Sequence, residues 1–210
     1  MTLWVILGIS AVAAYFLGCF NGAVIVSKYI LRDDVRNHGS GNAGLTNFIR
    51  NYGNTKALYV VAVDALKAVL SCLVMGNLLK SHDMYLQGVM LGGVAVMLGH
   101  VFPVLLGFRG GKGILSGLFI AIVADWRVAV LIAVVFFTIY FITRYVSLSS
   151  VCAAICFGVG FCVFHCDNIV VMVCGLFMMA LTVFMHRSNI ARLIQGKETK
   201  TDLFSKGKSK

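Results

Sequence analysis

Glycines, hydroxyl and amide side chains and an arginine stand close together between residues 38 and 50. Glycine lets backbone amides turn toward one point, and such a concavity attracts an anion. The spacing of the glycines matches G-x-G-x-x-G, but no strand is expected before them, so a dinucleotide fingerprint is excluded. A flexible polar turn is the alternative. The added donors favour an anion site, whose candidate residues are Ser40, Gly41, Asn42, Thr46, Asn47 and Arg50.

A second glycine-rich block follows Pro103, the only proline of the chain, which is expected to end or bend the preceding helix. Gly110, Gly111 and Gly113 surround Lys112 at the predicted start of the next helix. Free amides and the positive dipole end at a helix start favour phosphate. A cationic membrane anchor would explain the lysine but not the glycines. We therefore predict a phosphate cradle that is not a Walker A loop.

Two more polar blocks complete the set. Ser147, Ser149 and Ser150 could cap a helix start, which is the usual role of serine there. Their position opposite other polar loops predicts that one or two face a ligand. His186 and Asn189 are three positions apart and share a helical face. An interfacial helix whose arginines reach lipid headgroups is the alternative to a site role.

Three ionisable residues lie inside or at the end of apolar runs. Asp64 and Lys67 are spaced for an internal ion pair, which explains much of their presence in a span. Two roles are left open for His100: its side chain faces a ligand, or it is hydrogen-bonded within the protein at the end of a helix.

The composition indicates a membrane protein. The 210 residues are 60% hydrophobic and 12% charged, and the mean hydropathy is +0.91. Soluble domains are about half apolar and a quarter charged. The seven cysteines form no C-x-x-C pair, so packing is their expected role. The five histidines are scattered and predict no metal site. The basic tail predicts attraction to anionic membrane lipids rather than nucleic-acid binding.

Apolar runs predict about seven transmembrane helices, since a span needs roughly 17 to 25 apolar residues. We expect an all-α integral membrane protein with a retained first span. The expected segments are Leu3–Ile25, Ala57–Leu79, Tyr85–Leu106, Ile114–Ala124, Val128–Ile142, Val151–Phe164 and Ile169–Met185.

The distribution of cations predicts the orientation. The residues after Met185 carry seven Lys and Arg residues, which places the C-terminus in the cytoplasm. Seven spans then put the N-terminus outside and all four polar blocks on the cytoplasmic face. This arrangement requires the turn at residues 125–127 to separate two spans and to lie outside.

Taken together, the four blocks resemble the acyl-phosphate:glycerol-3-phosphate acyltransferase family of bacteria (PlsY). The resemblance covers about residues 15–198, in order and at fitting separations. Arg109 stands where lysine is expected, and residues 114–116 also depart from the pattern. The matching blocks are Gly39 to Asn47, Gly99 to Pro103 with Gly110 to Gly113, Ser147 to Ser150, and His186 to Ile190.

The resemblance implies an enzyme of the bacterial inner membrane that acylates the 1-hydroxyl of glycerol 3-phosphate, with a fatty acyl phosphate as the donor. The implied products are 1-acylglycerol 3-phosphate (lysophosphatidic acid) and inorganic phosphate. This reaction is the first acylation of phospholipid synthesis. The resemblance also implies a domain at residues 1–198 with its site facing the cytoplasm, a basic tail at 199–210, and no cofactor. Contact with the soluble enzyme that makes acyl phosphate is left open. By resemblance, Lys112, Ser150, His186 and Asn189 are the candidate catalytic residues, and Ser40, Gly41, Asn42, Thr46, Asn47, Arg50, His100, Gly110, Gly111, Gly113, Ser147 and Ser149 are the candidate substrate-binding residues.

No covalent nucleophile is indicated, so direct transfer is expected, with either a substrate phosphate or His186 accepting the hydroxyl proton. An acyltransferase that uses histidine followed five residues later by aspartate is excluded, because no histidine here has that partner. A phosphate-ester or lipid transporter is the competing class. It predicts a site near the membrane centre between related halves, and no repeat is seen. A lipid-binding scaffold would leave the glycine–cation arrangement unexplained.

Overall fold

The computed structural model describes residues 3–203, and all regular secondary structure within these residues is helical. The long helices are α1 (Leu3–Cys19), α4 (Ala57–Leu79), α5 (Tyr85–Val101), α6 (Ile114–Ala124), α7 (Trp126–Thr143), α8 (Val146–Phe164) and α9 (Ile169–Met185). The shorter elements are α2 (Gly22–Ile25), η1 (Val26–Ile30), η2 (Val35–Asn37), α3 (Leu45–Tyr52), η3 (Lys80–His82), η4 (Val104–Leu106) and α10 (Arg187–Ile194).

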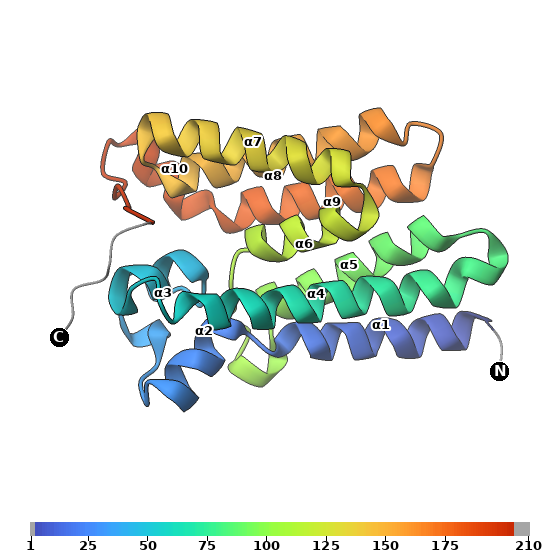
Figure 1. Ribbon diagram of the computed structural model, residues 1–210, viewed down its shortest axis with the longest axis horizontal. Coiled ribbons are helices and arrows are strands. Elements are labelled where there is room, and N and C mark those ends of the chain that lie inside the picture. The colour runs from blue at the N-terminus through green and yellow to red at the C-terminus, as the bar shows by residue number, and fades with distance from the viewer. Residues whose placement is uncertain (1–2, 204–210) are drawn as a thin grey trace.

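The long helices form two packed groups with α6 between them (Figure 1). In one group α5 packs against α1 and α4, and in the other α8 packs against α7 and α9. Helix α6, the shortest of these seven, contacts members of both groups. The core therefore runs through α6 and the facing sides of α5, α8 and α9, where Met97, Ile120 and Phe161 are fully or almost fully buried.

Large apolar side chains on the outer faces of the bundle are exposed, which is how a lipid-facing surface is built. Trp4 of α1, Leu66 of α4 and Ile142 of α7 are more than half exposed. Among residues 3–203, four helices are long and apolar enough to cross a membrane, and six spans result if each of two bent pairs counts as one. Ile114–Ala124 is a further, shorter apolar helix. Seven spans remains a prediction.

Three expected segments, Ala57–Leu79, Ile114–Ala124 and Ile169–Met185, have the predicted bounds. The first expected segment is broken, with a 43° bend between Leu3–Cys19 and Gly22–Ile30. Asn21 causes the new start, because its Oδ1 accepts from the amide of Val24 at 3.1 Å.

The helix α8 starts earlier than expected, at Val146 instead of Val151. The serine block therefore forms its first turn rather than a preceding loop. Each of these hydroxyls is small enough to lie against the first turn of a helix without interrupting it.

All four polar blocks lie at one end of the bundle, with α3 and α10 (Figure 1). The turn at Asp125 lies toward the other end, where His165 after α8 places Nε2 2.8 Å from Oδ2 of Asp125. The side chain of Asp125 also caps α7, accepting from the amide of Arg127 at 2.8 Å. The 125–127 turn thus separates two helices and lies away from the polar blocks. That these helices are two spans and that the turn lies outside remain predictions.

Candidate active site

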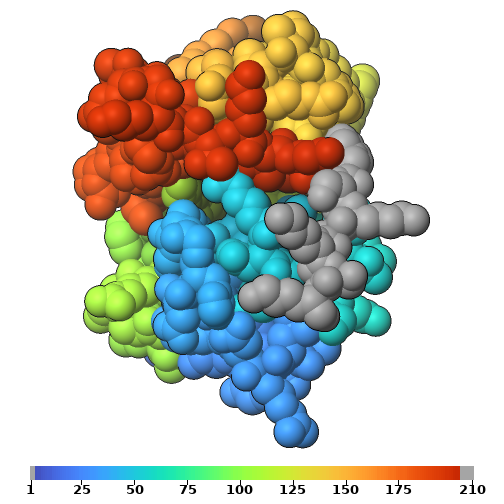
Figure 2. All heavy atoms as spheres, turned by 90° about the vertical axis from the view of Figure 1, so that its left-hand side faces the viewer, coloured from blue at the N-terminus to red at the C-terminus, as the bar shows by residue number. Residues whose placement is uncertain are grey.

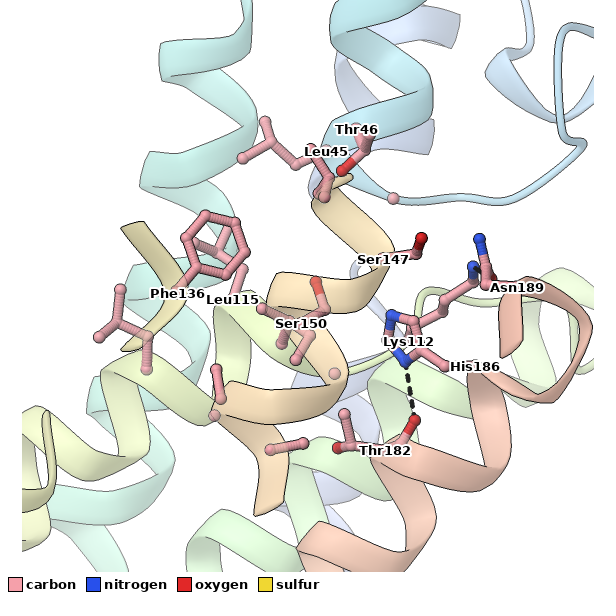
Figure 3. Close-up of a pocket in the computed structure, with 18 of the residues that line it drawn as sticks. Leu45, Thr46, Lys112, Leu115, Phe136, Ser147, Ser150, Thr182, His186 and Asn189 are labelled. Atoms are coloured by element: carbon pink, nitrogen blue, oxygen red, sulfur yellow. Dashed lines mark hydrogen bonds between the residues drawn. The ribbon is translucent and has the colours of Figure 1, made fainter. Parts of the chain in front are cut away.

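The four polar blocks line one cavity of about 310 Å³. Figure 3 shows the polar side chains of α3, α8 and the α9–α10 junction turned toward one space, with Leu115 and Phe136 beside it. The predicted site residues that line the cavity are Ser40, Asn42, Thr46, Asn47, Arg50, His100, Lys112, Gly113, Ser147, Ser150, His186 and Asn189.

Four helices begin at the cavity: α3, α6, α8 and α10. None of the four has a side-chain cap at its N-terminus. Residues of the first turn of each, Thr46, Ile114, Ser147 and Asn189, line the cavity. Free amides and the positive dipole ends of several helices therefore converge on one space, which favours a negatively charged ligand.

Lys112 lies in the loop before α6, and its Nζ donates to Oδ1 of Asn189. Nδ2 of Asn189 donates to Oε1 of Glu198 at 2.8 Å, and Nε of Arg192 lies 2.6 Å from Oε2 of Glu198. Burial and the nearby Arg192 and Arg50 cations lower the pKa of Lys112 to about 8. Around Lys112, the Glu198 carboxylate thus stands among the cations of Lys112, Arg192 and Arg50, and the net positive charge of these four groups suits a phosphate.

His186 follows the last turn of α9 and is buried. Its Nδ1 lies 2.8 Å from the carbonyl oxygen of Thr182 (Figure 3). A carbonyl only accepts, so Nδ1 carries the proton and Nε2 of the neutral ring is an acceptor. This tautomer is the one that a general base requires.

The side chain of Asn47 has contacts within the loop that precedes α3. Its Nδ2 contacts the carbonyl oxygens of Val35, His38 and Asn42 at 3.0 Å each, and its Oδ1 accepts from the amide of Ser40 at 3.1 Å. The side chain lies at the cavity wall but holds the 35–42 loop in shape.

The glycines of the second block also act through packing. The amide of Gly111 donates to the carbonyl of His100 at 3.0 Å, so it is not free for phosphate. A Cβ at Gly110 would lie 2.0 Å from that same oxygen. Neither glycine lines the cavity. They let the loop cross close to the end of α5, and this close approach carries Lys112 to its position.

Two more predicted residues lie outside the cavity wall. Gly41 adopts a left-handed conformation with φ of +68°, so it shapes the loop as expected. The hydroxyl of Ser149 donates to the carbonyl of Tyr145 at 2.9 Å, which is a bond within the first turn of α8 and not a cap. Of the three serines, Ser147 and Ser150 are the ones that face the cavity (Figure 3).

The described part of the tail packs against the site. Nε of Arg50 donates to the Thr201 hydroxyl at 2.8 Å, and Nη2 donates to the same hydroxyl and to the carbonyl of Thr199 at 3.1 Å. Viewed from this end, the tail lies beside α3 (Figure 2). Of the expected tail from 199 onward, Leu203 thus lines the cavity, and Thr199 and Thr201 hold Arg50 at its wall. Residues 204–210 of the predicted tail lie outside the described residues.

Sequence reasoning missed Glu198 and Arg192 as parts of the site. The available signal was their place in the fourth block, where Arg192 follows Asn189 at helical spacing. It also missed that Asp64, Lys67 and His100 form one cluster, with Nζ of Lys67 2.7 Å from Asp64 and 2.8 Å from Nδ1 of His100. The i,i+3 pair itself is confirmed.

An apolar extension of the cavity runs between α6, α7, α8 and α9. It is lined by Leu115, Leu118, Ile132, Ala133, Phe136, Phe137, Ala153, Ala154, Phe157, Met178 and Met179. One continuous space therefore joins a cationic end to an apolar groove. This pairing suits a ligand with a phosphate and a hydrocarbon chain.

Comparisons with known proteins agree with this chemistry. A crystal structure of PlsY, an integral membrane glycerol 3-phosphate acyltransferase, in its glycerol 3-phosphate form is similar with a TM-score of 0.85 and 32% identity, covering 93% of this chain and 96% of that one. The lysophosphatidic acid form of that enzyme gives a TM-score of 0.82 at 30% identity, covering 94% and 96%.

Sequence relatives give the same result. The glycerol-3-phosphate acyltransferase of Thermoanaerobacter pseudethanolicus is 38% identical over 192 residues, which are 91% of this chain and 94% of the relative. That of Finegoldia magna is 34% identical over 196 residues, covering 93% and 95%. The family model for glycerol-3-phosphate acyltransferase matches residues 8–196, and the chain belongs to this family of integral membrane acyltransferases.

Proposed function

We propose that this protein transfers a fatty acyl group from acyl phosphate to the 1-hydroxyl of glycerol 3-phosphate. The products are lysophosphatidic acid and inorganic phosphate. The observation that carries the proposal is the single cavity in which a cationic, amide-rich end continues into an apolar groove. Relatives crystallised in glycerol 3-phosphate and lysophosphatidic acid forms support this choice of acceptor and product.

Acyl phosphate as the donor is supported by the number of hydrogen-bond donors at the cationic end of the cavity. Lys112, Arg50 and the uncapped starts of four helices provide donors for more than one phosphate group. An acyl phosphate is a mixed anhydride with a good leaving group, so the site has only to place the hydroxyl and neutralise charge. The groove between α6 and α9 would hold the hydrocarbon chain.

In the proposed reaction the glycerol oxygen attacks the acyl carbonyl carbon, and the bond between that carbon and the phosphate oxygen breaks. The hydroxyl proton goes either to a substrate phosphate oxygen or to Nε2 of His186. Lys112 and the amides at the start of α6 would stabilise the departing phosphate. Within residues 3–203 no hydrogen bond joins a serine of the cavity wall to a histidine, which supports direct transfer over an acyl-serine intermediate.

The orientation in the membrane is part of the proposal. We place the site end in the cytoplasm because the polar blocks and the cationic tail share that end. Seven spans would then put the start of α1 outside. A reporter fused after residue 203 should be active only in the cytoplasm, and an active periplasmic reporter there would reverse the orientation.

The activity is tested with purified protein in detergent, glycerol 3-phosphate and palmitoyl phosphate. We expect equal amounts of inorganic phosphate and lysophosphatidic acid. Palmitoyl-CoA in place of palmitoyl phosphate should give no product. Phosphate release without lysophosphatidic acid would indicate hydrolysis, and no release together with counterflow uptake in liposomes would indicate a transporter.

A further inference from the structure

Asp64 and Lys67 form an ion pair inside the bundle that the proposed reaction does not use. Both side chains are at most 4% exposed, and Nζ of Lys67 lies 2.7 Å from Oδ1 of Asp64. Burying two charges costs free energy that their attraction only partly offsets. Such a pair within a membrane span needs a role beyond stability.

Two further partners of Lys67 are carbonyl oxygens, to which the lysine must donate, and a third is a ring nitrogen of His100. Nζ lies 3.2 Å from the carbonyl oxygen of Gly18, 3.0 Å from that of Phe20 and 2.8 Å from Nδ1 of His100. An ammonium group has donors and no acceptor. Nδ1 of His100 therefore accepts from Lys67. In a neutral ring the proton then belongs to Nε2.

The carboxylate does not compete for this ring. Oδ1 of Asp64 is 3.7 Å from Nδ1 of His100, which is too long for a hydrogen bond. Oδ1 accepts instead from Lys67 and from the amide of Gly22, at 3.2 Å. Asp64 thus holds the ammonium in place between α1 and α5, and Lys67 alone meets the imidazole.

The opposite nitrogen of His100 points at the loop that carries Lys112. A Cβ added to Gly111 would lie 2.1 Å from Nε2, and His100 lines the cavity although it is only 3% exposed. Within residues 3–203 no hydrogen bond is made to Nε2 of His100. The end of α5 is itself fixed, because the hydroxyl of Tyr15 donates to the carbonyl of Phe102 at 2.7 Å.

We propose that Asp64 and Lys67 are positioning residues that hold the proton of His100 on Nε2. This N–H group then donates a hydrogen bond to the phosphate of the acyl donor beside Lys112. The identity of this ligand rests on the proposed function, whereas the tautomer does not. Without Lys67 the ring is free to carry its proton on Nδ1. It would then turn a lone pair toward the phosphate oxygens.

The tautomer is measured directly by nitrogen NMR on protein labelled with ¹⁵N-histidine in detergent micelles. The His100 signals are assigned by their loss in His100→Gln. We expect a protonated Nε2 and an unprotonated Nδ1 at neutral pH. A protonated Nδ1, alone or in an imidazolium, would overturn the proposal, and this result does not depend on catalytic activity.

Kinetics test the positioning role. Removing a residue that orients a site group typically costs about 10- to 100-fold, so Lys67→Met should lower kcat/KM for palmitoyl phosphate by that factor. The loss should appear mainly in the KM of palmitoyl phosphate, with the KM of glycerol 3-phosphate little changed. A loss confined to kcat, or equal in both KM values, contradicts the proposal.

A double-variant cycle separates positioning from general damage. The amide of His100→Gln supplies a donor near the place of Nε2 without any tautomer to control. Adding Lys67→Met to that background should change kcat/KM by less than about threefold, because residues acting through one another are not additive. Two losses that multiply would show that Lys67 acts independently of His100.

Asp125→Asn is the matched control, because Asp125 also contacts a histidine and a cation but at the other end of the bundle. It should leave both KM values unchanged. Asp64→Asn should reproduce the effect of Lys67→Met and replaces that variant if the latter does not fold. If the wild-type protein transfers no acyl group, the proposed function fails, while the NMR result still decides the tautomer.

Discussion

Lys112 donates a hydrogen bond to the side-chain oxygen of Asn189, which stands 77 residues further along the chain. The acceptor is a neutral amide, so the lysine is held in place without an opposing charge beside it. Asn189 is itself held by Glu198 at 2.8 Å. The carboxylate thus orients the lysine through the amide and leaves the positive charge of Lys112 available for a phosphate.

The lowered pKa of Lys112 predicts a pH dependence. Burial and nearby cations lower this pKa to about 8, so the amine is charged below that pH and loses its proton above it. We expect kcat/KM for palmitoyl phosphate to be level near pH 7 and to fall as the pH rises through about 8, approaching tenfold per pH unit. The measurement is a pH profile from 7 to 10 at low substrate concentration.

Lys112→Arg is the control for that profile, because guanidinium stays charged over the whole range. Its activity should be lower, since the side chain differs in shape, but should not fall between pH 8 and 9.5. An equal fall in both proteins would assign the titration to another group. Lys112→Ala should abolish phosphate release while the protein still folds.

Asn189→Ala should reduce kcat/KM by about 10- to 100-fold, the usual effect of losing a residue that orients a functional group. It also leaves Glu198 without one of its donors, which should lower the free energy of unfolding by about 1–3 kcal/mol. Asn77→Ala is the matched control, because that amide makes one exposed bond to the carbonyl of Leu73. Its kinetics should equal those of the wild type.

His186→Ala distinguishes the two proton acceptors. If Nε2 of His186 takes the hydroxyl proton, turnover at saturating substrates should fall by about 100-fold or more, the range for general base catalysis. Near-normal turnover would remove histidine as the base and leave a substrate phosphate in that role. Thr182→Val is the control for this variant, because it changes only the Thr182 side chain and keeps the backbone carbonyl that accepts from Nδ1 of His186.

Thr201→Val should raise the KM of glycerol 3-phosphate by about three- to tenfold, since a side-chain hydrogen bond to a charged group contributes about 1.5–3 kcal/mol, only part of which serves binding. The hydroxyl fixes Arg50 through both Nε and Nη2. In an Arg50→Ala background the same change should have no further effect on KM. An independent effect would give Thr201 a role that does not pass through Arg50.

Ala154→Phe should shorten the acyl chain that the enzyme accepts. Ala154 is buried and lines the apolar groove, so a phenyl ring there occupies space along the proposed path of the chain. We expect activity with palmitoyl phosphate to fall while octanoyl phosphate is retained. The added volume should cost about 1–3 kcal/mol of stability. Val159→Phe, on the exposed face of α8, is the control and should not change the preference.

The amino-acid sequence by itself determined the class of the protein and the content of its site. Apolar run length predicts α4, α6 and α9 to the residue, because a helix inside a membrane must satisfy its own backbone and be apolar along its length. The cation count puts the polar blocks on one face. Local chemistry also predicts that Lys112 and Arg50 belong to an anion site.

The tertiary structure decided what each residue contacts. Packing of the helices brings Lys112 to Asn189 and the tail to Arg50. The hydrophobic periodicity of single helices does not predict contacts between residues so far apart in the sequence. The tertiary structure also gave Asn47 and Gly111 backbone partners within the protein. It also joined Lys67 to His100, because the geometry of two crossing helices sets which nitrogen meets the ammonium.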